Sequence, residues 1–227
     1  MIREHHLAVR RTARYFTLGT ASPDVRELWI ACHGYGQLAA PFLSSFASIA
    51  APSRLVVAPE ALSRFYLDRT LRTSEPPPRV GATWMTREDR DSEIADQVSY
   101  LDDLHDALQE QLEGQAASTD GRVRLRVVGF SQGVATVSRW MAYGRTRADA
   151  LILWAGSFPP DVDLAALAPR LHRSAVTFVV GARDELAPWA NADVQLQRFT
   201  EAGIAARLVT FEGGHRLDDA TLVSLSE

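Results

Sequence analysis

The sequence predicts an α/β fold in which a mostly parallel central sheet carries helices on both faces. Short apolar runs alternate with amphipathic helical patterns along most of the chain, and glycine-rich motifs directly follow the ends of several runs. With 227 residues, of which 46% are hydrophobic, the chain is expected to form a single domain over residues 1–227. Ligands of such sheets bind beyond the carboxyl ends of the strands, so the motifs indicate where a site is expected.

The expected strands are short runs rich in apolar and β-branched residues, bounded by glycine, proline or charged residues. Residues 11–18 are interpreted as an early strand, or as part of a hairpin with the residues before them. The remaining strands are expected, in chain order, at residues 27–32, 54–58, 122–128, 150–154, 175–180 and 206–211.

The clearest helical pattern runs from Ser92 to Glu113, with apolar residues three and four positions apart. Asp91 or Ser92 can cap its start, and Gly114 follows its end. Further helices are expected at residues 38–49, directly after residues 129–133, and at residues 191–200. Residues 68–90 contain three consecutive prolines and many charges, and we interpret them as a long loop near the candidate site.

Composition argues against several classes of function. The net charge of −4 disfavours a broadly basic surface that binds nucleic acid. Cys32 is the only cysteine, so no internal disulfide and no cysteine cluster that could hold a metal can form. We expect no cofactor. Neither a signal peptide nor an apolar run long enough to span a bilayer is present. We therefore expect a cytoplasmic protein without a membrane span.

The motif with the clearest chemical meaning is Gly129-Phe130-Ser131-Gln132-Gly133, which has the pattern G-x-S-x-G. It follows a predicted strand and precedes a predicted helix, which is the context of a nucleophile elbow. Such a turn strains the serine and projects its hydroxyl from the sheet, while the following helix N-terminus favours developing negative charge. Ser131 is therefore the candidate nucleophile. The alternative is a glycine-containing turn whose serine only caps the helix.

A serine hydroxyl is a weak nucleophile near neutral pH and needs an adjacent base. Of the six histidines, His215 directly follows a predicted strand and two glycines near the C-terminus. This position fits the order nucleophile, acid, histidine that is found after such an elbow. We interpret His215 as the base; the alternative is an ordinary surface histidine in a loop.

The base needs a carboxylate that orients it and stabilises its charged form. Asp184 follows the strand predicted at residues 175–180 and precedes His215 by one strand–helix unit, so it is the candidate acid. A purely structural role for Asp184, as a helix cap or an ion-pair partner, is the alternative. Other carboxylates considered for the acid are Glu185, Asp161 and Asp163.

Acyl transfer also needs donors for the oxyanion that forms during the reaction. One expected donor is the backbone N–H of Gln132, the residue after the nucleophile. The other is the backbone N–H of Tyr35, in the glycine-rich residues 33–36 (HGYG) that follow an early strand. His33 is expected to support this loop. The alternative is a glycine-rich turn without a ligand role.

Taken in order, HGYG, GFSQG, AGSFPP, GARDE and GGH resemble the carboxylesterase/phospholipase group of the α/β-hydrolase superfamily, which includes acyl-protein thioesterases and small bacterial carboxylesterases. The resemblance covers residues 28–215, most of the chain. It implies the α/β-hydrolase fold without a large cap domain and without a metal. The catalytic residues that it implies are Ser131, Asp184 and His215, with oxyanion donors at Tyr35 and Gln132.

The resemblance also implies an acyl pocket, to which Trp84 and Phe158 contribute, and it loosely matches Leu186 to an apolar segment after the acid. The full set of predicted substrate-binding residues is Trp84, Met85, Phe158, Leu186 and Trp189. The expected activity is hydrolysis of carboxylic esters or thioesters with short to medium acyl chains through an acyl-enzyme. The alternative functions are a triad-bearing ligand-binding protein, an acyltransferase or a perhydrolase on the same fold.

Overall fold

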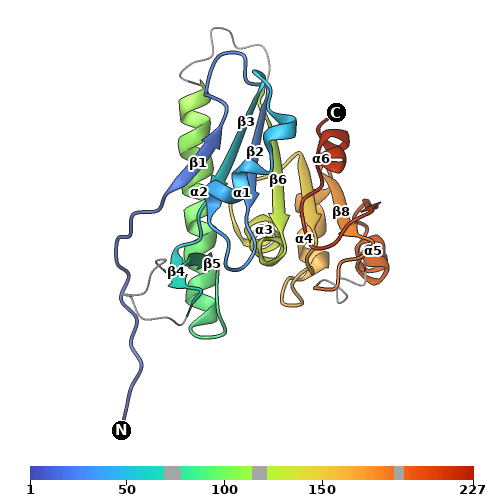
Figure 1. Cartoon of the computed structure of the whole chain (residues 1–227). Helices are drawn as coiled ribbons and strands as arrows, with labels where there is room; N and C mark the ends of the chain where they lie inside the picture. Colours follow the sequence, from blue (N-terminus) through green and yellow to red (C-terminus); the bar gives the residue numbers. More distant parts are fainter. Residues whose placement is uncertain (69–77, 114–121, 187–191) are drawn as a thin grey trace.

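The computed structural model describes residues 1–68, 78–113, 122–186 and 192–227. The strands of the main sheet are β1 (Tyr15–Leu18), β2 (Glu27–Cys32), β3 (Arg54–Pro59), β6 (Arg124–Phe130), β7 (Ala150–Trp154), β8 (Ala175–Gly181) and β9 (Ala206–Phe211). They form a seven-stranded sheet in the order β1-β3-β2-β6-β7-β8-β9 (Figure 1). Only β1 pairs antiparallel with its neighbour, so the mostly parallel sheet that the sequence predicts is confirmed.

Helices cover both faces of this sheet. They are α1 (Ala39–Ser44), the 3-10 helix η1 (Ala47–Ile49), α2 (Arg90–Glu113), α3 (Gln132–Tyr143), α4 (Leu164–Leu171), α5 (Ala192–Glu201) and α6 (Asp219–Ser226). Alternate residues of the fully buried strand β2 point to opposite faces. Leu28 and Ile30 pack with residues of α2 to α5, whereas Trp29 and Ala31 pack with residues of α1, η1 and α6.

The expectation of a long loop at residues 68–90 is wrong for residues 80–83. Within the described part, Val80–Thr83 forms strand β5, which pairs antiparallel with β4 (Ser63–Tyr66). Residues 69–77 lie outside the described residues. Gly81 explains the close packing of β5, since a Cβ there would lie 2.4 Å from the backbone oxygen of Gly36. The second sheet therefore lies backbone to backbone against the HGYG loop.

Three element boundaries differ from the prediction. Residues 1–14 have no regular secondary structure, so they form no hairpin with β1. The helix expected at residues 38–49 is divided into α1 and η1 at Ser44 and Ser45, whose short hydroxyl side chains favour helix ends. Helix α2 begins at Arg90, because Asp89 adopts a positive φ of 45° and its carbonyl accepts the N–H of Glu93.

The parallel arrangement brings the motifs to one edge of the sheet. Strands β6, β8 and β9 run in the same direction, with β7 between β6 and β8. Their carboxyl ends are followed by Ser131, by the turn that carries Asp184 and by the turn that carries His215. Residues that lie up to 84 positions apart in the sequence therefore meet at this edge.

Candidate active site

Ser131 lies on a sharp turn between β6 and α3. Its backbone has φ 55° and ψ −117°, a region that residues with a side chain rarely adopt and that is typical of functional sites. The turn is held by the Ser131 N–H, which donates to the Trp154 carbonyl at 2.8 Å. Glycine is required at position 133, since a Cβ there would lie 2.2 Å from the Cys32 carbonyl oxygen. The sequence therefore strains the serine while its helix packs tightly against β2.

The imidazole of His215 lies between a hydroxyl and a carboxylate. Its Nε2 is 2.9 Å from the Ser131 Oγ, and its Nδ1 is 2.9 Å from one oxygen of Asp184 and 3.1 Å from the other. An ionised carboxylate only accepts hydrogen bonds, so Nδ1 carries the proton and Nε2 presents its lone pair to the serine hydroxyl. His215 is therefore oriented so that its Nε2 can accept the proton of the Ser131 hydroxyl.

Asp184 is fixed from several sides. Its side chain is fully buried, and its Oδ1 also accepts the backbone N–H of Leu186 at 3.0 Å. The turn that carries it is bonded to the turn after β9: the Ala182 N–H donates to the Phe211 carbonyl and the Arg183 N–H to the Gly213 carbonyl. The carboxylate and the imidazole are therefore held by one bonded pair of turns.

The alternative carboxylates have other partners or remain in solvent. Asp161 pairs with Arg139 at 2.9 Å and Arg90 at 2.7 Å, and the hydrogen bond from Arg139 lowers its pKa to about 2. Asp163 caps α4 by accepting the N–H of Ala165, and Glu185 is exposed. Among the described carboxylates, Asp184 is the one that bonds to the imidazole of His215.

The HGYG loop lies directly over the serine. A Cβ on Gly34 would come within 3.1 Å of the Ser131 Cβ, and β5 braces the loop through the Gly36 N–H and the Ala82 carbonyl at 2.8 Å. The backbone N–H groups of Tyr35 and Gln132 make no hydrogen bond to any residue that the structure describes. Both groups are thus left available for an oxyanion.

The side chain of His33 supports this loop, as the sequence predicts, and the side chain of Gln132 holds the residues that follow β5. His33 is fully buried, with Nδ1 2.8 Å from the Gly34 carbonyl and Nε2 accepting the Ala61 N–H at 3.1 Å. Burial lowers the pKa of His33 and keeps its ring neutral. The Gln132 amide accepts the Trp84 N–H at 3.1 Å and donates to the Met85 carbonyl at 3.0 Å. No local sequence pattern signals this contact, which joins residues 47 and 48 positions apart.

The predicted substrate-binding residues differ in how far their side chains are exposed. Trp84 and Phe158 are both 3% exposed; the Trp84 indole donates to the His33 carbonyl, and Phe158 packs edge-on against Phe199. Met85 is partly buried, with its sulfur 3.0 Å from an Arg139 nitrogen, whereas Leu186 is 75% exposed. Trp189 lies outside the described residues. Burial in the core thus explains why Trp84 and Phe158 are not open pocket walls.

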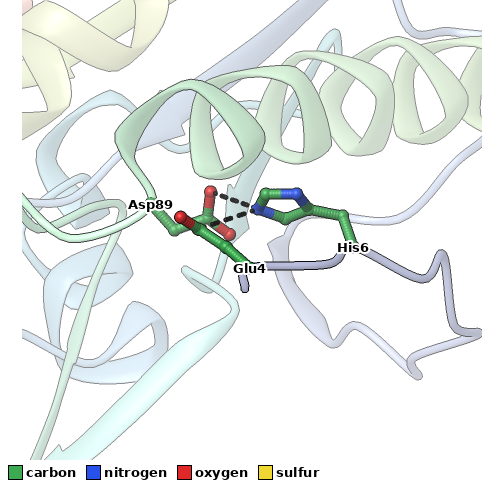
Figure 2. Close-up of side chains that lie close together, drawn as sticks. All are labelled: Glu4, His6 and Asp89. Atoms are coloured by element: carbon green, nitrogen blue, oxygen red, sulfur yellow. Dashed lines mark hydrogen bonds and ion pairs between the residues drawn. The ribbon is translucent and has the colours of Figure 1, made fainter. Parts of the chain in front are cut away.

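Two cavities and one group of possible metal ligands lie away from the triad residues in the part of the chain that the structure describes. Two cavities, of about 630 and 610 Å³, border α2, and neither is lined by Ser131, Asp184 or His215. Among the described residues, the one group that could hold an ion is Glu4, His6 and Asp89 (Figure 2), all exposed and all on segments that carry no triad residue. The described part of the chain also contains no helix that is both long and apolar enough to cross a membrane.

Comparisons with known proteins give independent information on the fold. No family model and no curated protein matches the chain. Solved structures match almost its whole length. Esterase PE8 is 22% identical with a TM-score of 0.62, and the match covers 95% of this chain and 97% of that one. The chain has the α/β-hydrolase fold. Among the described residues, no cap domain covers the sheet edge.

Two further matches have the same fold at lower identity. A phospholipase/carboxylesterase from Dyadobacter fermentans is 11% identical with a TM-score of 0.63, covering 96% of this chain and 97% of that one. The Bacillus cereus carboxylesterase is 12% identical with a TM-score of 0.62, covering 94% and 92% respectively. The α/β-hydrolase fold that the sequence predicted is therefore confirmed.

Proposed function

We propose that the chain is a serine hydrolase that cleaves carboxylic esters or thioesters with short to medium acyl chains, of the carboxylesterase/phospholipase type. One observation carries the proposal. A continuous path of hydrogen bonds runs from the Ser131 hydroxyl through His215 to the buried Asp184 carboxylate, with 2.9 Å at each step. Several proteins that share the fold are named as esterases or carboxylesterases, which supports the same class of reaction.

In the proposed reaction, His215 Nε2 takes the Ser131 proton as the hydroxyl oxygen attacks the acyl carbon. The carbonyl oxygen becomes an oxyanion, which the backbone N–H groups of Tyr35 and Gln132 stabilise. The tetrahedral intermediate then collapses, and the alcohol or thiol leaves with the proton from His215. Water, deprotonated by His215, attacks the acyl-enzyme, and the carboxylic acid is released as Ser131 regains its proton.

We assign the substrate contacts among the predicted residues according to how exposed each side chain is. Met85 and Leu186 are proposed to contact the acyl group, because Met85 is tied to Gln132 and Leu186 follows Asp184 by two positions. Trp84 and Phe158 are proposed to support this region from within the core, since their side chains are buried.

The test is hydrolysis of p-nitrophenyl acetate, butyrate and octanoate and of the matching thioesters. Wild-type protein is expected to turn over at least one series, and Ser131→Ala is expected to lose activity by more than about a thousandfold. Ser44→Ala is a matched control, since Ser44 is exposed on α1, and it should retain full activity.

Labelling with a fluorophosphonate probe separates an enzyme from a ligand-binding protein that has the same residues. The active hydrolase should be modified rapidly at Ser131, while a protein with an unreactive serine should label poorly. Rapid labelling at another residue, or undiminished turnover by Ser131→Ala, would refute the proposal.

A further inference from the structure

Trp84 is hydrogen-bonded to both loops that carry the proposed oxyanion donors. Its backbone N–H donates to the side-chain oxygen of Gln132 at 3.1 Å, and its indole N–H donates to the His33 carbonyl at 2.9 Å. Gln132 supplies one of the proposed donors, and His33 begins the HGYG loop that contains the other, Tyr35. A single residue therefore connects the two halves of the proposed oxyanion hole.

Burial suits Trp84 to this role. The residue is only 3% exposed, so its two hydrogen bonds are shielded from solvent. The indole lies against the His33 imidazole, with 5.1 Å between the ring centroids and 34° between the ring planes. The amide nitrogen of Gln132 donates to the Met85 carbonyl at 3.0 Å, which fixes the chain directly after Trp84. Both the backbone and the ring of Trp84 are thus held in place.

The carbonyl groups of the HGYG loop connect Trp84 to the orientation of the Tyr35 N–H. The His33 carbonyl accepts the Trp84 indole N–H, and the Gly34 carbonyl lies 2.8 Å from His33 Nδ1. Because His33 Nε2 accepts the Ala61 N–H, the ring proton is on Nδ1, which donates to the Gly34 carbonyl. In a trans peptide the N–H points opposite to the carbonyl, so this bond directs the Tyr35 N–H away from the buried His33 ring.

We propose that Trp84 is a positioning residue that sets the separation and orientation of the Tyr35 and Gln132 N–H groups, an inference that rests on the proposed hydrolase function. Oxyanion donors stabilise a transition state when they are held in advance at the correct distance from the developing charge. Without the indole N–H, the His33 carbonyl loses its donor, and the HGYG loop is free to shift relative to Gln132. A displacement of about 1 Å can cost about a hundredfold in rate, even from a substitution remote from the reacting atoms.

The test replaces Trp84 by benzothienylalanine, which keeps the two fused rings and has sulfur in place of the indole N–H. We expect kcat for a p-nitrophenyl ester to fall by about tenfold to a hundredfold, with KM changed by less than about twofold, because the oxyanion forms only in the transition state. A trifluoromethyl ketone, which forms a hemiketal oxyanion with a serine, should lose affinity by a factor similar to the loss in kcat/KM. Trp84→Phe also lacks the donor and is the second variant, with the same expected result.

Trp140 is the matched control. It is fully buried, and its indole N–H donates to Asp102 at 2.8 Å in a bond between α3 and α2. The same replacement at Trp140 should lower Tm at least as much, because a hydrogen bond to a carboxylate is the stronger one. It should nevertheless leave kcat and the affinity for the trifluoromethyl ketone within about twofold of wild type. The comparison separates a loss of stability from a loss of alignment.

Nitrogen-15 relaxation of the free protein gives a readout that does not depend on catalysis. The order parameter of the Tyr35 amide should fall from about 0.85 to below about 0.6 in the Trp84 variant and stay unchanged in the Trp140 variant. An inactive wild-type protein that shows this difference would refute the proposed function while supporting the role of Trp84 in fixing the loop. With an active wild-type protein, unchanged kcat and ketone affinity in the Trp84 variant would overturn the proposal, as would an equal loss of kcat in both tryptophan variants.

Discussion

Replacing Asp184 by Asn keeps the shape of the side chain but is expected to reverse the direction of the hydrogen bonds through His215. In the structure, Oδ1 accepts the Leu186 N–H at 3.0 Å, while Oδ2 lies 2.9 Å from His215 Nδ1. The Leu186 N–H requires an acceptor, so the oxygen of the introduced amide should occupy the Oδ1 position and its NH₂ group the Oδ2 position. The NH₂ group then donates to Nδ1, and the imidazole proton moves to Nε2.

With its proton on Nε2, the imidazole faces the Ser131 hydroxyl as a donor and cannot accept the serine proton. Loss of the correct tautomer, together with loss of the carboxylate charge, costs about 10³ to 10⁴ in kcat. This corresponds to about 4–5 kcal/mol of transition-state stabilisation. KM should change little, because Asp184 is buried and contacts no substrate in the proposed reaction.

The measurement is kcat and KM for a p-nitrophenyl ester, with circular dichroism to confirm folding. Asp163→Asn is the matched control: Asp163 caps α4 by accepting the Ala165 N–H, and asparagine caps helices equally well. The control should retain wild-type activity. An Asp184→Asn protein that is folded and keeps kcat within about tenfold of wild type would show that this tautomer argument is wrong.

Three other predictions concern stability and reactivity. Gln132→Leu leaves the Trp84 N–H and the Met85 carbonyl without their partner, so calorimetry should show a loss of about 2 kcal/mol, or about 6 °C in Tm. Asp161 has its pKa lowered to about 2 from 3.8, so it stabilises the fold above about pH 4 and this contribution disappears as pH falls toward 2; the Tm difference between wild type and Asp161→Asn should therefore be larger at pH 6 than at pH 2.5. Burial raises the pKa of the Cys32 thiol, so a thiol reagent at neutral pH should modify the unfolded protein but not the native one.

The central strands of the main sheet could be predicted from the sequence, because parallel strands buried on both faces consist of continuous apolar runs. Strand β2 is buried along its whole length, and β7 likewise. Strands β4 and β5 gave no such signal. β4 alternates between partly buried and exposed residues, and β5 is four residues long. They are held by pairing with each other and by backbone bonds to the HGYG loop, which are contacts between distant segments.

The same distinction applies to the site. Each candidate triad residue follows a strand, and fold geometry alone brings the ends of parallel strands together, so their meeting could be anticipated. The contact between Gln132 and Trp84 joins residues 48 positions apart, and nothing local in the sequence signals it. For the same reason the burial of Trp84 and Phe158 could not be foreseen: aromatic side chains suit a pocket wall and a core equally well.

The turns that carry the acid, the imidazole and the serine are linked to one another. The turns after β8 and β9 are joined by two backbone hydrogen bonds. Trp154, at the end of β7, connects them to the serine turn, because its carbonyl accepts the Ser131 N–H at 2.8 Å and its indole N–H donates to the Arg216 carbonyl at 3.0 Å. A substitution that loosens any one of these turns is therefore expected to disturb the alignment of all three side chains.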